Sequence, residues 1–155
     1  MATTTAYLNG LLTTQFDYTK TFIWNGRFRT ASYTNSTGGT VTLASGTVLG
    51  RIFATGLVVP MVSTATNGSQ IPIGILRGSH VVLNGASATL TYCYSGDVDP
   101  AALTFSNGTD TFATVILFNS SVPAATTTQY GTIEDILVGK GINPVAGVEN
   151  TIADN

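Results

Sequence analysis

The sequence has few of the residues on which catalysis or covalent cross-linking depends. Among 155 residues there is one cysteine, Cys93, and one histidine, His80. A single cysteine excludes an internal disulfide framework, and its place between Tyr92 and Tyr94 on an apolar stretch favours a buried small side chain. Ser79 cannot activate His80 through adjacency alone, because neighbours on a strand point to opposite sides. We therefore expect no catalytic residue.

Motifs that hold metals, phosphates or cofactors are also missing. The sequence contains no phosphate-binding loop, no zinc-ligand spacing and no nucleophile elbow. Asp97 and Asp99 form an acidic pair of the kind found in calcium loops, but no full set of ligands surrounds them. Asp99 before Pro100 is explained more simply as the cap of a helical turn. We expect neither a metal nor a cofactor.

Charge is scarce, at 9% of residues against about 25% in ordinary soluble domains. The formal net charge is −2 and the six basic residues are scattered, which argues against a nucleic-acid partner. A weakly charged surface of Thr, Ser, Asn and Gly suits a protein packed at high local density, although a hardy β-domain with a threonine-rich face would look the same. The apolar runs are far shorter than the roughly 20 residues of a membrane span, and the stretch MATTTAYLNG shows no signal peptide.

What the sequence does contain is a series of short strands. Between Val41 and Leu76 the apolar residues come in runs of four to six that stop at Gly, Pro or Asn-Gly, the pattern of strands joined by tight turns. Asn67-Gly68 predicts a hairpin-type turn. Pro72 has no N–H for a ladder, so its strand should lie at an edge or begin at a bulge.

Turn signals and apolar patterns place the remaining elements. Asn25-Gly26 predicts a hairpin between residues 21–24 and 27–33, and Asn84-Gly85 predicts a second one between residues 81–83 and 88–94. Residues 112–118 are typical of a buried strand. The one convincing helix is Ile133–Val138, begun by a Thr132/Asp135 capping box, and residues 142–145 predict a short returning strand. We expect Phe22, Trp24 and Phe28 to contribute to the core.

The first 20 residues differ from the rest. They are rich in threonine and carry large apolar residues spaced along them: Tyr7, Leu8, Leu11, Leu12 and Phe16. We expect no turn to fold the segment back before Phe16, so it should be an extended arm that orders against a partner. An ordinary first strand packed on its own domain is an equal alternative. The domain organisation is then an arm over residues 1–20 and a single β-rich domain over residues 21–155.

Three stretches resemble one known family. Ser63–Leu76, Ala88–Gly96 and Ile133–Val145 are similar to parts of the head decoration proteins of lambda-type tailed phages. The resemblance implies a mainly β fold of the family's β-tulip type, a small β-barrel-like or β-sandwich-like domain with one short C-terminal helix and an extended N-terminal arm. It also implies localisation on the outer capsid surface of the virion after synthesis in the host cytoplasm.

The same resemblance implies a structural function. The protein would bind the expanded capsid as a homotrimer and stabilise it against the pressure of packaged DNA, with the major capsid protein as partner and with no nucleic acid, membrane or small-molecule substrate. Tyr7, Leu8, Leu11 and Leu12 would be the capsid-binding residues of the arm.

Two other classes of function stay open. A carbohydrate-binding or adhesive β-module on a virion or cell surface would need exposed aromatic residues, such as Trp24, Tyr92 or Tyr94, as a stacking platform. A hydrolase is the third possibility, and the inventory of reactive residues gives it little support.

Overall fold

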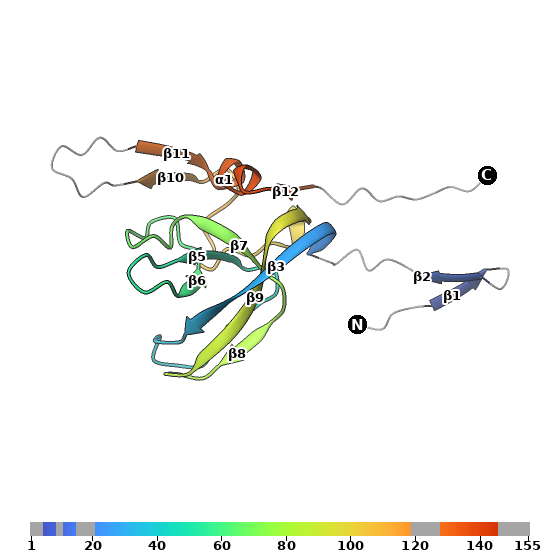
Figure 1. Ribbon diagram of the computed structural model, residues 1–155, viewed down its shortest axis with the longest axis horizontal. Helices are drawn as coiled ribbons and strands as arrows, with labels where there is room; N and C mark the ends of the chain where they lie inside the picture. The colour runs from blue at the N-terminus through green and yellow to red at the C-terminus, as the bar shows by residue number, and fades with distance from the viewer. Residues whose placement is uncertain (1–4, 9–10, 15–20, 119–127, 146–155) are drawn as a thin grey trace.

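A computed structural model describes residues 5–8, 11–14, 21–118 and 128–145 of the chain, and Figure 1 shows how its elements are arranged. The elements are, in chain order, β1 (Thr5–Leu8), β2 (Leu11–Thr14), β3 (Phe22–Thr34), β4 (Val41–Leu43), β5 (Val48–Arg51), β6 (Val58–Pro60), β7 (Pro72–Leu76), β8 (His80–Val82), β9 (Ser87–Val98), the 3₁₀ turn η1 (Pro100–Ala102), β10 (Val115–Phe118), β11 (Thr128–Thr132), α1 (Ile133–Gly139) and β12 (Ile142–Pro144). The expectation of a mainly β chain with one short helix near the C-terminus is confirmed. No helix among these elements is long and apolar enough to cross a membrane.

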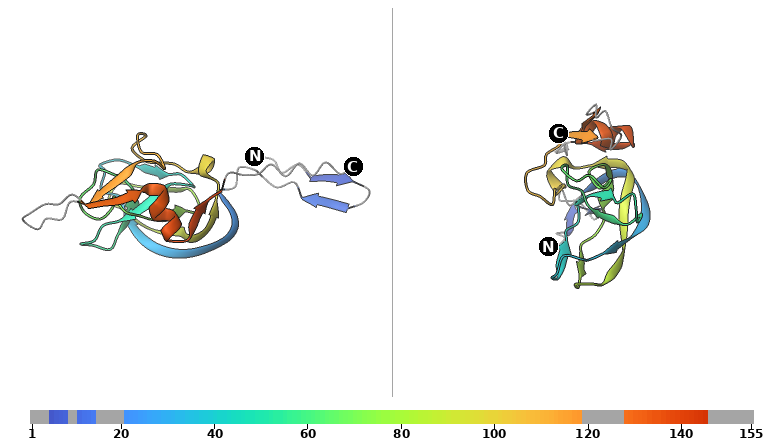
Figure 2. Two further views of the ribbon diagram at one scale, coloured as in Figure 1. Left: turned by 90° about the horizontal axis from the view of Figure 1, so that it is seen from above. Right: turned by 90° about the vertical axis from the view of Figure 1, so that its left-hand side faces the viewer.

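The long strand β9 organises the body, by which we mean residues 21–118 and 128–145. It pairs antiparallel with β3 along most of its length, antiparallel with β7 at Tyr92 and Cys93, and parallel with β12 at residues 96–98. Beyond β7 the sheet continues through β5 to β6. The long β3 bends around the body (Figure 2), but no ladder joins it to β6 in the described part of the chain. The sheet is therefore open at this point and does not form a closed barrel.

Both faces of this sheet are buried, because successive residues of its strands point to opposite sides. Val48, Ile75 and Cys93 belong to one apolar cluster, which also contains Ile133 and Leu137 of α1. Their neighbours in sequence lie in a second cluster that includes Leu43 of β4 and Val82 of β8. The helix thus covers one face and the β4–β8 ribbon covers the other. Each fully buried Leu or Ile contributes roughly 1.5–3 kcal/mol relative to an exposed one.

The hairpin predicted at Asn25-Gly26 is wrong. Residues 22–34 form one continuous strand, and the pairing of β3 with β9 shifts register between residues 22 and 28. Asn25 has a φ of 49°, so the Asn-Gly pair supplies the irregular backbone of a bulge and not a reversal. Phe22 and Phe28 pack on the first cluster as expected, with ring centroids 5.3 Å apart. The Trp24 side chain lies outside the described residues.

The turns predicted at Asn84-Gly85 and Asn67-Gly68 are present, but neither joins two strands that pair with each other. Gly85 and Gly68 both have positive φ, as turns require. However, β8 pairs with β4 and not with β9, and β6 and β7 lie on either side of β5 instead of next to each other. The expectation for Pro72 is met in part. It begins β7 opposite an irregularity in β5, but that strand is internal because β9 covers its other side.

The C-terminal elements follow the sequence closely. The helix α1 begins with the predicted capping box, in which the Thr132 hydroxyl accepts from Asp135 N–H and the Asp135 carboxylate accepts from Thr132 N–H. The returning strand is β12, and η1 is capped by Asp99 with Pro100 at its first position. The predicted strand over residues 112–118 is shorter than expected and begins at Val115.

The N-terminal segment also differs from expectation in one respect. Residues 5–8 pair antiparallel with residues 11–14, so β1 and β2 form a hairpin instead of one extended strand. The two intervening residues are Asn9 and Gly10, the dipeptide most typical of two-residue hairpin loops, so the sequence itself carries a local signal for this hairpin. The hairpin pairs with no other described strand and lies apart from the body in Figures 1 and 2.

Candidate functional site

The four predicted capsid-binding residues form two cross-strand pairs on the hairpin. In the register of β1 and β2, Tyr7 lies opposite Leu12 and Leu8 lies opposite Leu11. These are the two cross-strand pairs next to the loop, so residues that are up to five positions apart in sequence become direct neighbours. The structure thus brings the predicted residues together as two pairs at consecutive positions, which alternate between the two faces of the hairpin.

The two candidate reactive residues, Cys93 and His80, occupy structural positions in β-strands. Cys93 is fully buried in the first apolar cluster, its Sγ donates to the Ser95 carbonyl at 3.1 Å, and burial raises the pKa of the thiol above its usual value. A raised pKa disfavours the thiolate, which is the nucleophilic form. His80 begins β8, where it pairs with Leu43. Neither residue has the partner that catalysis would need within the described chain.

The acidic residues do not assemble a cation site. Asp99 caps η1 by accepting a hydrogen bond from the Ala101 N–H. Asp97 accepts from the Asn143 amide at 3.1 Å. No group of three or more potential metal ligands occurs among the residues that the structure describes. The two aspartates therefore have separate structural partners.

The aromatic residues of β9 do not form the platform that a carbohydrate module would need. Tyr92 is buried, and its hydroxyl accepts a hydrogen bond from Arg51 at 3.2 Å. The ring of Tyr94 is covered by the Arg29 guanidinium, 4.3 Å from the ring centroid. Stacking of a sugar needs an exposed ring face, so these two tyrosines do not support a carbohydrate-binding function.

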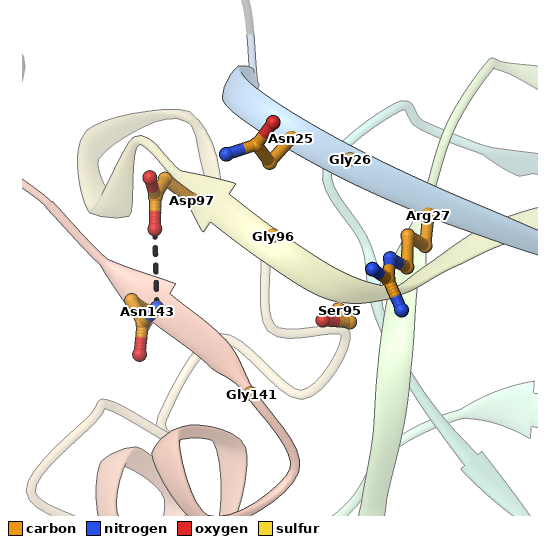
Figure 3. Close-up of a pocket in the computed structure, with 8 residues that line it drawn as sticks. All are labelled: Asn25, Gly26, Arg27, Ser95, Gly96, Asp97, Gly141 and Asn143. Carbon is orange, nitrogen blue, oxygen red and sulfur yellow. Dashed lines mark hydrogen bonds between the residues drawn. The ribbon is translucent and has the colours of Figure 1, made fainter.

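A hollow of about 670 Å³ opens where β3, β9 and β12 meet. It is lined by residues from three distant parts of the chain, which Figure 3 shows in close-up: Asn25, Gly26, Arg27, Ser95, Gly96, Asp97, Gly141 and Asn143. The Asp97–Asn143 pair lies on one side and Arg27 on the other, with Ser95 and Gly96 between them (Figure 3).

Three glycines shape this hollow. Gly96 has a φ of 138°, and a Cβ placed on it would lie 2.8 Å from the Cα of Gly26. The two strands therefore touch backbone to backbone here, which only glycine permits. Gly141 has a φ of 80° and lies close to the Ser95 side chain. With Asn25, unusual backbone conformations gather around one site, as is common where proteins bind partners.

The sequence carries one local signal for this hollow. Asn25-Gly26 indicates an unusual backbone, although it predicts a turn and not a bulge, and the strand expected over residues 88–94 ends before Gly96. The lining residues are about 70 and 45 positions apart along the chain, and the pairing of β9 with both β3 and β12 brings them together. These pairings have no local signature in the sequence.

Comparison with known proteins identifies one family. The family model described as the bacteriophage lambda head decoration protein D matches residues 23–116, which is more than half of the chain. Two of the stretches that carried the resemblance, Ser63–Leu76 and Ala88–Gly96, lie inside this match. The segment Ile133–Val145 and the β1–β2 hairpin lie outside it. No curated protein matches the chain significantly.

Proposed function

The chain belongs to the family of the bacteriophage lambda head decoration protein D, a structural component of phage heads, and from this premise we propose that it binds the outer surface of the expanded capsid as a trimer and stabilises the shell. The observation that carries the proposal is the family match over residues 23–116. The partner is the major capsid protein, and the protein acts without catalysis or a cofactor.

The hairpin β1–β2 supplies the first contact in this proposal. The backbones of its two strands form hydrogen bonds with each other along one edge. The other edge of each strand pairs with no strand of the described chain. Such an edge can add to a strand of the capsid protein through main-chain hydrogen bonds. These bonds do not depend on side-chain identity, so they tolerate the slightly different environments of a large shell. The domain organisation is then an arm over residues 1–20 and a β-rich domain over residues 21–155.

Affinity comes from repetition of a weak contact. Each main-chain hydrogen bond contributes only about 1 kcal/mol net, and ordering an arm costs roughly 1–2 kcal/mol per residue, which burial of Tyr7, Leu8, Leu11 and Leu12 helps to offset. Three arms on one rigid trimer gain roughly 10²–10⁴ in avidity over a single arm. The trimer then joins neighbouring capsomers and opposes the outward pressure of the packaged DNA.

Co-sedimentation with expanded, undecorated capsid shells tests this function. The full chain should pellet with the shells, saturate at a fixed number of copies per shell and raise the temperature at which the shells break. If the protein stays in the supernatant even when it is added in large excess over the binding positions on the shells, the proposal is overturned. A glycan-binding screen on the same preparation tests the carbohydrate alternative, to which the buried Tyr92 and the covered Tyr94 offer no ring face for stacking.

A further inference from the structure

We propose that the hollow between β3, β9 and β12 receives an acidic loop of the capsid protein, whose carboxylate binds the guanidinium of Arg27. This inference rests on the proposed function, because it names a second contact with the same partner and the chemistry by which that contact is recognised.

The position of the hollow is the first argument. Thr21, where the described body begins, accepts a hydrogen bond from Asp99 N–H at 2.9 Å, and Val145, where it ends, donates to Val98 at 2.9 Å. Both ends are therefore attached at the end of β9, next to the Asp97 wall of the hollow. The beginning of β3 and the end of β12 lie at one end of the body (Figure 1). If the N-terminal arm contacts the capsid, the hollow is on the side of the molecule that faces it.

The second argument is that Arg27 differs from the other arginines of the body. Arg29 covers the Tyr94 ring, Arg77 lies 4.6 Å from the centroid of the Phe28 ring, and Arg51 donates to Tyr92. Arg27 is exposed and makes no side-chain hydrogen bond to another described residue. The register shift between residues 24 and 28 places it at the hollow. No residue of the described chain occupies its five N–H donors, two of which can bind a carboxylate through parallel hydrogen bonds.

The third argument concerns the opposite wall. Asp97 is held by Asn143 at 3.1 Å and is not paired with Arg27, so the hollow presents a positive group on one side and a negative group on the other. A peptide loop suits both, since its acidic side chain accepts from Arg27 while its main-chain N–H groups donate to Asp97. A phosphate or a nucleic-acid backbone has no donor for Asp97 and is repelled by it.

Charge reversal at Arg27 tests this inference, with Arg77→Glu as a control that makes the same charge change outside the hollow. Binding to expanded shells is measured for the full-length variants after circular dichroism and thermal melting have shown that they fold. Arg27→Glu should weaken shell binding by about tenfold or more, Arg27→Lys less, and Arg77→Glu by less than about twofold. Because the contact is ionic, the deficit of Arg27→Gln should shrink as salt rises from about 50 to 200 mM.

The outcomes separate the two proposals. If the unmodified chain binds shells and Arg27→Glu binds equally well, the acidic-loop inference is overturned and the proposed function stands. An equal loss with Arg77→Glu would also overturn the inference, because it would indicate a general effect of charge. If the unmodified chain does not bind shells, the proposed function itself fails.

Discussion

Single residues decide whether the hollow can exist. At Gly96 a side chain has nowhere to go, because the Gly26 backbone lies where the Cβ would be and the φ of 138° is one that only glycine adopts easily. Gly78 is a useful contrast, since a Cβ at that position meets nothing within 4 Å. The two glycines are alike in the sequence, and only the structure distinguishes their roles.

We predict that Gly96→Ala lowers the free energy of unfolding by about 2–3 kcal/mol, as expected for a strained backbone combined with a backbone collision. Gly78→Ala should change it by less than about 0.5 kcal/mol. Urea denaturation of the two variants and the unmodified protein measures both effects. Equal stabilities for Gly96→Ala and Gly78→Ala would show that β3 and β9 do not touch at this point.

Asp110 is the residue whose ionisation contributes most clearly to folding. Its carboxylate is buried and accepts hydrogen bonds from the Ser63 N–H, at 2.9 Å, and from the Ser63 hydroxyl. Burial by itself raises the pKa, but the hydrogen bonds from Ser63 and Asn107 outweigh it and hold the pKa of this carboxyl below its usual value. A lowered pKa in the folded state means that the charged form stabilises the fold above the unfolded pKa of about 3.9.

Asp110→Asn should therefore lower the free energy of unfolding by roughly 1–3 kcal/mol at pH 7. The difference from the unmodified protein should shrink as the pH falls through the folded pKa of Asp110, because the carboxyl is then protonated in both states. Denaturant titrations at several pH values between 7 and 2 measure this difference in the free energy of unfolding. Ser63→Ala, which removes one of the hydrogen bonds to Asp110, is expected to have a smaller effect. A deficit that does not depend on pH would contradict the role given to the charge.

His80 and Cys93 should be dispensable for function. The double variant His80→Gln plus Cys93→Ala is expected to bind and protect shells like the unmodified protein. It should lose about 1–2 kcal/mol of stability, because Cys93 is fully buried and alanine leaves a small cavity. Shell binding and thermal melting are measured together. A folded variant that no longer protects shells would show that one of these residues has an active role.

At the scale of elements, caps and turn residues predicted the helix and the turns well, but the sequence did not predict which strands pair with each other. The helix α1 and the turn η1 are specified by caps within a few residues of their first turn, so the sequence was enough to place them. Asn25-Gly26 and Asn84-Gly85 specify only an unusual backbone at one point. Which strand pairs with which is decided by burial on both faces of the sheet, and that depends on residues far apart in the chain.

The two candidate sites also differ in how far the sequence predicts them. The capsid-binding candidates Tyr7, Leu8, Leu11 and Leu12 can be selected from the sequence because they are apolar residues in a polar segment. The register of β1 and β2 joins them into two cross-strand pairs. The hollow could not be predicted, because Arg27, Asp97 and Asn143 come from three separate strands. A weak local signal existed at Asn25-Gly26, but a bulge and a hairpin turn use the same dipeptide.

At the scale of the whole molecule, the account requires a closed assembly on the shell. Three copies around a three-fold position present three equivalent arms, and closed symmetry prevents uncontrolled growth. We predict that the bound form is a homotrimer, to be checked by image reconstruction of decorated shells and by light scattering of protein released from them. A bound dimer would be incompatible with a trimer that joins capsomers.

The central claim is that the N-terminal segment binds the capsid while the body folds without it, and removal of residues 1–15 tests this most directly. Co-sedimentation with expanded shells and thermal melting are measured on the truncated and full chains, with Leu8→Asp plus Leu12→Asp as a milder variant. The account predicts that truncation abolishes shell binding and leaves the melting temperature almost unchanged, since β1 and β2 pair only with each other among the described strands. A truncated protein that binds shells normally, or that loses several kcal/mol of stability, would contradict it.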